Sequence, residues 1–278
     1  MYLVFDIGGT KMRVAFSSNG KSFDAVEQAK TPQKFSEAVL IFKSLADKVS
    51  GGKKIKFAAG GIAGPINKDK DSLVNAPNLP DWNGKNIKSY FEKVLKCPVR
   101  LENDATMGAL GEAIYGAGKD KKIVAFLTIS TGIGGARIVD GKIDVSSRGF
   151  EPGHIIIDPK YALCDNCPTP PYLENMCSGK SLTQRFGKDP KDIDMPHIWE
   201  DLALWLAYGL NNIAVLWSPD VIVLGGPMMF GSPAIPITLI DTNYKDIVKI
   251  FSNPPEIRLC ELKDDAGLRG ALHYLKDF

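Results

Sequence analysis

Two segments of this chain place hydroxyl groups and glycines directly after an apolar strand. One follows a strand at 3–7 and the other a strand at 124–129. Their turn residues are Gly8, Gly9, Thr10 and Lys11 in the first, and Ser130, Thr131, Gly132, Ile133, Gly134 and Gly135 in the second. Without Cβ atoms a ligand can approach the backbone, and the exposed amides of such turns form an anion-binding concavity. Both turns therefore indicate phosphate binding.

The first turn also carries side chains suited to a phosphate and its counter-ion. Thr10 and Lys11 can contact phosphate directly, and the Asp6 carboxylate can hold a hydrated magnesium ion. The spacing is neither that of a Walker loop nor that of a dinucleotide-binding turn. Either segment alone could be a plain β-hairpin, because strands at 12–16 and through 138–139 follow. Two such hairpins on duplicated α/β halves resemble the actin-like ATPase and sugar kinase architecture.

Asp104 lies where a short strand (99–101) gives way to a helix of small residues. The helix dipole and the free amides of the first turn would keep its carboxylate ionised. A kinase acting on alcohols needs a carboxylate that accepts the proton of the attacking hydroxyl. The alternative is a helix N-cap, which is the commonest use of Asn-Asp at such a boundary.

A third group of polar residues lies on loops in the second half of the chain. Glu151 and His154 come from Glu-Pro-Gly-His, and Glu174 follows later. Two carboxylates and an imidazole can bind adjacent hydroxyls of a sugar ring and discriminate their stereochemistry. The alternatives are ordinary loop charges and a structural histidine.

Gly225 and Gly226 end a further buried strand, residues 221–224. Without side chains at this turn, a flat nucleoside could lie against the backbone. A tight exit from a helix-to-strand connection would give the same short pattern.

Length and composition restrict the class of protein. At 278 residues, with 44% hydrophobic and 24% charged residues, the chain can build two globular cores. A net charge of +2 is too small to indicate a nucleic-acid groove. No apolar run reaches the ~20 residues of a membrane helix, and no secretory signal is evident at the N-terminus. The five cysteines favour a reducing cytoplasm over a disulfide framework.

Strands and helices alternate along most of the chain, which predicts an α/β fold with ligands beyond the strand ends. We expect strands at 2–6, 12–17, 22–28, 55–59, 99–101, 123–129, 221–224 and 257–259, and helices at 35–48, 87–95, 105–115, 197–217 and 266–276. Residues 150–174 read as an irregular loop rich in cysteine and proline.

These motifs, in this order, resemble the ROK family of sugar kinases and repressors along nearly the whole chain. The resemblance implies two actin-like ATPase/sugar kinase (ribonuclease H-like) domains with a cleft between them. We expect the first domain at 1–116, completed by the helix at about 266–278, and the larger, sugar-binding domain at 117–265. We also expect a cytoplasmic homodimer without nucleic-acid or membrane partners.

The resemblance implies ATP-dependent phosphorylation of a hexose hydroxyl, usually O6, with Mg²⁺. It assigns Asp104 as the base. It assigns sugar binding to Gly64, Asn78, Asn103, Glu151, His154 and Glu174. It assigns ATP binding to Asp6, Gly8, Gly9, Thr10, Lys11, Thr131, Gly132, Gly225 and Gly226.

In many ROK members the histidine at the position of His154 also holds a structural zinc with three cysteines. Here Cys164 and Cys167 match two of them, and Tyr172 occupies the place of the third. His154, Cys164 and Cys167 could still bind zinc, with Cys177 or Asp165 as fourth ligand. The alternative is a loop in which proline rigidity replaces the metal.

Three classes of function remain. We expect a kinase of glucose or a related hexose, with an N-acetylmannosamine or N-acetylglucosamine kinase as the alternative. A sugar-responsive repressor would need a helix-turn-helix domain of ~60 residues before the first hairpin, which begins here at the N-terminus. An actin-like ATPase that binds protein would not need the sugar-binding block.

Overall fold

The structure is a computed structural model that describes residues 1–277 and divides into two compact units. Unit 1 comprises Met1–Tyr115, Val145–Gly149 and the C-terminal segment from Asp264, and unit 2 comprises Gly116–Asp144 and Phe150–Lys263. Each unit is built on one five-stranded sheet.

The sheet of unit 1 has the order β3-β2-β1-β4-β5. β1 (Tyr2–Ile7), β2 (Lys11–Ser17) and β3 (Ala25–Lys30) form an antiparallel meander. β4 (Phe57–Ile62) and β5 (Val99–Asn103) continue the sheet in parallel with β1. Because the carboxyl ends of parallel strands lie at one edge, the residues that follow β1, β4 and β5 are neighbours.

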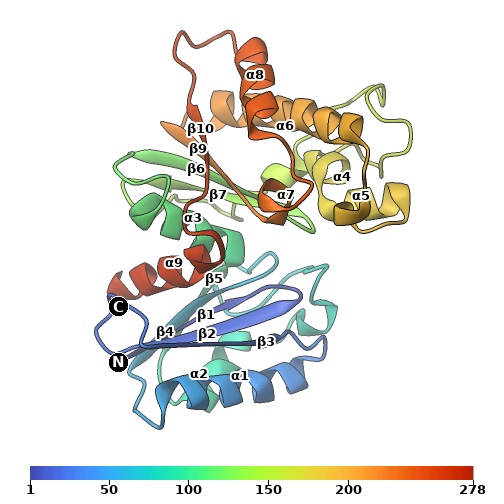
Figure 1. Ribbon diagram of the computed structural model, residues 1–278. Helices are drawn as coiled ribbons and strands as arrows, with labels where there is room; N and C mark the ends of the chain where they lie inside the picture. Colours follow the sequence, from blue (N-terminus) through green and yellow to red (C-terminus); the bar gives the residue numbers. More distant parts are fainter. Residues whose placement is uncertain (278) are drawn as a thin grey trace. The chain divides into compact units, whose positions relative to one another are not determined.

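Helices cover both faces of this sheet (Figure 1). α1 (Phe35–Ser50) and α2 (Ile87–Leu95) lie on one face. There Phe42 stacks on Phe91 at 4.0 Å between ring centroids, and the edge of Phe5 meets both rings. α3 (Asp104–Tyr115) and α9 (Ala266–Tyr274) lie on the other face. The aromatic cluster explains why α1 and α2 each carry one apolar face.

Glycines let α3 and α9 pack backbone against backbone. A Cβ at Gly111 would collide with the Ala266 carbonyl, and one at Gly270 with the Met107 carbonyl. Only glycine permits this interhelical distance, which fixes the N-terminal turn of α3 relative to α9.

Unit 2 has the sheet order β10-β9-β6-β7-β8. β6 (Ile123–Ile129) and β7 (Ile133–Val139) form the second hairpin, which β8 (Lys142–Ile143) extends. β9 (Val221–Gly225) and β10 (Glu256–Leu259) run parallel to β6. The core between sheet and helices is rich in leucine, isoleucine and tryptophan.

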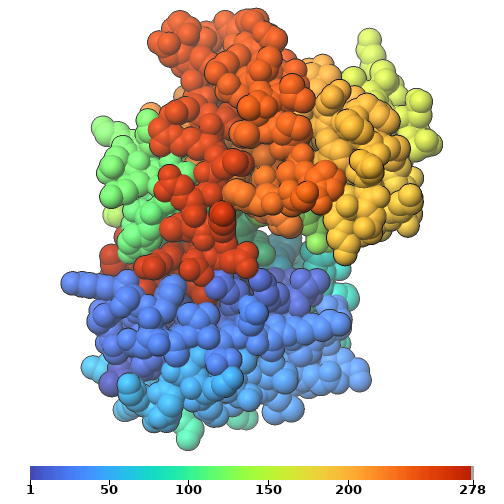
Figure 2. All heavy atoms as spheres, in the orientation of Figure 1, coloured from blue at the N-terminus to red at the C-terminus, as the bar shows by residue number. Residues whose placement is uncertain are grey.

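The main helices of unit 2 are α6 (Pro196–Trp217) and α8 (Ile237–Ile247), which pack on each other. Shorter helices are α4 (Leu173–Cys177), α5 (Gly179–Phe186) and α7 (Pro227–Phe230). In Figure 2 the orange to orange-red surface of this unit belongs to the segments from α6 to β10.

The helices α4, α5 and α8 were not expected from the sequence. In α5 only Leu182 is a buried large apolar residue, and the Ser178 hydroxyl caps the helix by accepting from the Ser181 N–H at 3.2 Å. α8 is held to its surroundings by the buried Ile240 and Tyr244. Capping and tertiary packing therefore determine that these segments are helical, and apolar periodicity does not reveal either of them.

The third strand and the fourth are shifted relative to the sequence expectation. β3 begins at Ala25, because residues before it form turns. β4 begins at Phe57 and continues through Gly60 and Gly61 to Ile62, beyond the strand expected at 55–59. A Cβ at Gly60 would collide with Phe5, and one at Gly61 would lie 2.7 Å from the Cα of Asp104. Gly60 is therefore needed for close approach to β1 inside the sheet, and Gly61 for close approach of α3 to the sheet.

Among the described residues, no helix is long and apolar enough to cross a membrane.

We predict that Gly270→Ala destabilises the protein, although alanine favours helix by ~1 kcal/mol. The added methyl group would collide with the Met107 carbonyl, and overpacking of this kind costs about 1–3 kcal/mol. Urea unfolding measures the change, with Ser89→Ala on the exposed surface of α2 as control. A variant as stable as the control would contradict backbone contact between α3 and α9.

Candidate active site

The first hairpin of unit 1 is a tight turn braced by a neighbouring threonine. The Gly8 N–H donates to the Lys11 carbonyl at 2.9 Å. The buried Thr31 donates its hydroxyl to the Gly8 carbonyl at 2.8 Å and its N–H to the Thr10 carbonyl at 2.9 Å. A Cβ at Gly9 would lie 2.8 Å from the Cβ of Asn78. The turn therefore brings Asn78, a predicted sugar-binding residue, against the predicted phosphate motif.

Asp6 lies at the end of β1, beside the first turn of α9. A Cβ at Gly267 would lie 2.7 Å from its carboxyl group. Burial raises the pKa of Asp6 to about 7, and the negative charge of Asp104 adds to the shift. The cations Arg13 and Lys11 act in the opposite direction. Two carboxyl groups thus interact at one end of the sheet, which is where a divalent cation would lower the repulsion between them.

Lys11 and Arg13 have acidic partners at the start of the C-terminal segment. The Lys11 ammonium lies 2.9 Å from Asp264, and the Arg13 guanidinium lies 2.7 Å from Asp265. The sequence analysis missed these two aspartates, because about 250 residues separate them from β2 and no local pattern links them. Lys11 is consequently paired with a carboxylate in this structure.

Asp104 is the first residue of α3, and the cap of this helix is Asn103. The Asn103 Oδ1 accepts from the Thr106 N–H at 3.1 Å, which is the bond expected of an N-cap residue. The Asp104 Oδ1 accepts from the Ala105 N–H at 2.9 Å and from the Asn103 Nδ2 at 3.1 Å. The Oδ2 atom takes part in neither bond. The N-cap alternative for Asp104 therefore applies to its neighbour instead.

Burial raises the pKa of Asp104 to about 6, against the hydrogen bonds from Ala105, its own amide and Asn103, which lower it. A carboxylate with a pKa near 6 is ionised at neutral pH and is a stronger base than an ordinary aspartate. This combination suits a general base.

The Asn103 amide is fully engaged within unit 1. Its Nδ2 donates to the Gly64 carbonyl and to Asp104, each at 3.1 Å. Its Oδ1 accepts from the amide of Thr106 and, at 3.4 Å, from the hydroxyl of that residue. Because an amide side chain has two donors and two acceptor sites, these bonds use its whole capacity. In this structure Asn103 orients Gly64 and Asp104.

The second hairpin, in unit 2, is bonded to both α4 and α5. The Gly179 and Lys180 amides donate to the Ser130 and Thr131 carbonyls at 2.8 and 3.1 Å. The Glu174 Oε2 accepts from the Ile133 N–H at 2.7 Å. A Cβ at Gly132 would lie 2.5 Å from that oxygen. One of the predicted sugar-binding carboxylates thus contacts the predicted phosphate-binding turn directly.

Glu151 precedes a short 3-10 turn beside the same hairpin, and His154 is the last residue of that turn. Both residues are exposed, and the His154 N–H donates to the Glu151 carbonyl at 3.1 Å. The turn packs closely because a Cβ at Gly153 would collide with the Ile133 carbonyl. The ring of His154 lies 5.0 Å from that of Tyr172, between centroids.

Gly225 and Gly226 end β9, as expected. A Cβ at Gly225 would lie 3.2 Å from the Cys260 Sγ and 3.3 Å from the Phe126 ring. Gly226 has a φ of +91°, and a Cβ there would collide with the Ile129 carbonyl. Packing inside unit 2 by itself requires glycine at both positions.

The cysteine loop differs from the expected zinc site. Cys164 and Cys167 form a disulfide, so in this form neither sulfur is a thiolate ligand. The sequence analysis expected no disulfide framework, and this single bridge is the one departure from that expectation among residues 1–277, where Cys97, Cys177 and Cys260 are free. Among residues 1–277, no group of three or more His, Cys, Asp or Glu side chains is arranged to hold a metal ion. The His154 imidazole faces Tyr172 instead, in the place of the missing third cysteine.

A family model described as the ROK family matches residues 2–277. The glucokinase of Thermotoga maritima is 26% identical, over 98% of this chain and 96% of the relative. The N-acetyl-D-glucosamine kinase of Escherichia coli O9:H4 is 29% identical, over 98% of each chain. The crystal structure of a ROK glucokinase from Streptomyces griseus with glucose and AMPPNP has a TM-score of 0.81 at 24% identity, over 100% of this chain and 99% of that one.

The two sheets and their helices define a two-domain α/β protein of the actin-like ATPase fold, which confirms the expected fold class. The protein belongs to the ROK family. Its relatives include sugar kinases that act on different hexoses.

We predict three free thiols per chain, from Cys97, Cys177 and Cys260, when the protein is unfolded without reductant. After reduction all five cysteines should react. Thiol titration in denaturant, combined with elemental analysis for zinc, measures both states. Five thiols without reductant together with one zinc per chain would support the metal site over the disulfide.

We predict that Asp104→Asn stabilises the protein at pH 7.5 but not at pH 4. The folded-state pKa of about 6 lies above the usual value of 3.8, so ionisation removes stability as pH rises from 4 through 6. Asparagine cannot ionise and avoids that loss, which is up to about 3 kcal/mol. Urea unfolding at both pH values measures the difference, with the exposed Asp192→Asn as control. Equal effects of Asp104→Asn at the two pH values would contradict the raised pKa.

Proposed function

We propose that the protein is an ATP-dependent hexose kinase with Asp104 as its general base. The observation that carries this proposal is the half-buried Asp104 carboxyl at the first turn of α3, with a pKa of about 6 and one oxygen outside its hydrogen bonds. Such a group is ionised at neutral pH and can accept the proton of a sugar hydroxyl. The crystallised S. griseus relative holds glucose and an ATP analogue, which supports these substrates.

In the proposed reaction the Asp104 carboxylate accepts the proton of the hexose hydroxyl as its oxygen attacks the γ-phosphorus of ATP. The bond from the γ-phosphorus to the bridging oxygen breaks, and ADP leaves with the electron pair. Most of the rate enhancement in such transfers comes from positioning and electrostatics. Asn103 contributes by orienting Asp104 through its hydrogen bond at 3.1 Å.

We assign phosphate binding to the amides and side chains of the two hairpins, at Gly8, Gly9, Thr10, Lys11, Thr131 and Gly132. Mg²⁺ supplies charge neutralisation at the phosphates when it is bound. Asp6 would hold it through water, because carboxylate oxygens are preferred magnesium ligands and its buried carboxyl already interacts unfavourably with Asp104. Lys11 would exchange its partner Asp264 for phosphate.

We assign adenosine to Gly225 and Gly226, and hexose binding to Gly64, Asn78, Glu151, His154 and Glu174. The position of Glu174 supports this assignment, because its Oε2 accepts from the Ile133 N–H and so holds the side chain against the second hairpin. Its other oxygen could accept from a sugar hydroxyl at the same time. Asn103 acts on the hexose through Gly64 and Asp104.

The substrate is tested by ADP release with glucose, N-acetylmannosamine, N-acetylglucosamine, allose and fructose. We expect release to depend on the sugar, with glucose or a near relative giving the highest kcat/KM. Release that is independent of every sugar would indicate an ATPase and would contradict the proposal. A preference for an acetylated hexosamine would identify the alternative kinase.

Asp104→Asn should lower kcat by roughly 100- to 10,000-fold, the usual contribution of a general base. Shape and hydrogen-bonding capacity are retained, so hexose binding, followed by calorimetry, should change little. Asp192→Asn serves as the control because that side chain is exposed in unit 2. Wild-type turnover in Asp104→Asn would show that another group accepts the proton.

A further inference from the structure

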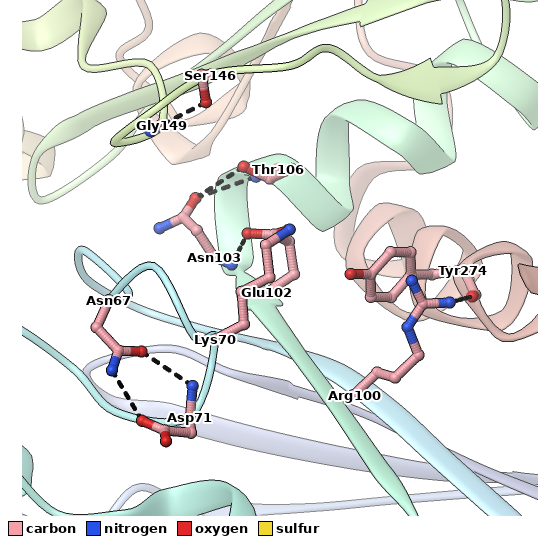
Figure 3. A network of polar contacts seen from close by, with 10 residues as sticks. All are labelled: Asn67, Lys70, Asp71, Arg100, Glu102, Asn103, Thr106, Ser146, Gly149 and Tyr274. Carbon is pink, nitrogen blue, oxygen red and sulfur yellow. Dashed lines mark hydrogen bonds and ion pairs between the residues drawn. The ribbon is translucent and has the colours of Figure 1, made fainter. Parts of the chain in front are cut away.

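Glu102 is a nearly buried carboxylate immediately before Asn103 and Asp104. Its side chain is 10% exposed, at the end of β5. The Oε1 atom accepts from the Asn103 N–H at 3.0 Å, and Oε2 pairs with the Lys70 ammonium. Neither the kinase chemistry nor the sugar assignments use this carboxylate. Both of its oxygens are engaged within unit 1, as Figure 3 shows for the side chains around it.

Lys70 belongs to a loop that the Asn67 side chain holds together through hydrogen bonds. The Asn67 Oδ1 accepts from the amides of Asp71 and Ser72 at 3.0 and 3.2 Å. The Asn67 Nδ2 donates to the Asp71 carboxylate at 2.8 Å (Figure 3). Lys70 itself has a φ of +52°, a conformation that is uncommon for residues with a side chain. The uncommon backbone conformation thus occurs at the same residue that pairs with Glu102.

The C-terminal helix forms the third side of this network. The Arg100 guanidinium lies 3.8 Å from the centroid of the Tyr274 ring and donates to the Tyr274 carbonyl at 3.0 Å. The Lys70 ammonium lies 6.0 Å from the same ring. Although burial lowers the pKa of Lys70, the charge of Glu102 and its bond to Lys70 raise it overall. The ammonium is therefore charged at neutral pH and is placed between the carboxylate and the aromatic ring.

The loop carrying Lys70 is also the connection from Gly64 to Asn78, both assigned to the hexose. At its start, the Gly64 carbonyl accepts from the Asn103 side chain. At its centre, Lys70 pairs with Glu102, which holds the Asn103 backbone. The loop is thus attached twice to the residues that orient Asp104.

We propose that Lys70 and Glu102 form a positioning pair that couples the hexose-binding loop to the catalytic aspartate, with neither residue touching the substrate. The inference rests on the proposed function. An exposed ion pair usually contributes little, and Lys70 is 46% exposed. Glu102 is different, because removing Lys70 leaves a nearly buried carboxylate without its cation. Glu102 must then shift, and the Asn103 amide and the Asp104 side chain shift with it.

The test compares Lys70→Met, Lys70→Arg, Glu102→Gln and the double variant Lys70→Met/Glu102→Gln. Lys68→Met is the matched control, an exposed lysine of the same loop. We expect Lys70→Met to lower kcat/KM for the hexose by about 10-fold, with the KM for ATP changed less than 2-fold. Lys70→Arg should recover most of the loss, and Lys68→Met should match the wild type.

Coupling within the pair predicts that the double variant is no worse than Lys70→Met, because each change breaks one shared interaction. Losses that multiply in the double variant, or wild-type hexose kinetics in Lys70→Met, would overturn the proposal. A lowered melting temperature with unchanged hexose kinetics would show that the pair is only structural, and would also overturn it.

Amide hydrogen exchange separates this inference from the proposed function. Lys70→Met should raise exchange both in the loop, residues 64–78, and at the start of α3, residues 103–107. If the wild type shows no sugar-dependent ADP release, the proposed function fails. Amide exchange alone then tests whether the Lys70–Glu102 pair couples the loop to α3. Faster exchange confined to the loop would then contradict coupling to Asp104.

Discussion

A missing side chain in the middle of the first sheet is the constraint on which the candidate active site depends. β4 lies between β1 and β5, and in register Gly61 is opposite both Asp6 and Glu102. Any Cβ at Gly61 would lie 2.7 Å from the Cα of Asp104. Glycine at this position lets the first turn of α3 lie directly on the sheet. The acidic side chains can then share one edge of it.

The concentration of negative charge at this edge has an energetic cost that is consistent with a functional role. Burial raises the pKa of both Asp6 and Asp104, so each is less stable as an ion here than in water. Structural ion pairs would lower these values instead. The surrounding cations Lys11 and Arg13 relieve Asp6 in part, and their partners come from the C-terminal segment. Groups held in such unfavourable states are common at sites that bind cations or transfer protons.

In unit 2 one carboxylate connects two motifs that the sequence presents separately. Glu174 bonds the Ile133 amide, while the turns of Ser130 and Thr131 are held by the amides that open α5. A substitution at Gly132 would therefore disturb Glu174 as well as the amides of the turn. The same reasoning applies to Gly9 and Asn78 in unit 1. The predicted phosphate and sugar motifs are therefore in direct contact within each unit.

The sequence by itself determined the α/β class, the two hairpins and most helices, because apolar periodicity and glycine turns are local signals. It also identified the family through motifs in a fixed order. Only the tertiary structure decided that Asn103 rather than Asp104 caps α3, that Cys164 and Cys167 are joined, and that Lys70 pairs with Glu102. The ion pair depends on a distance between residues 32 apart in the chain, the disulfide on the local path of the loop, and the cap on competition between neighbours for the same amide. Residue types and spacing do not show which of two adjacent polar side chains, here Asn103 and Asp104, will cap the helix in the folded backbone.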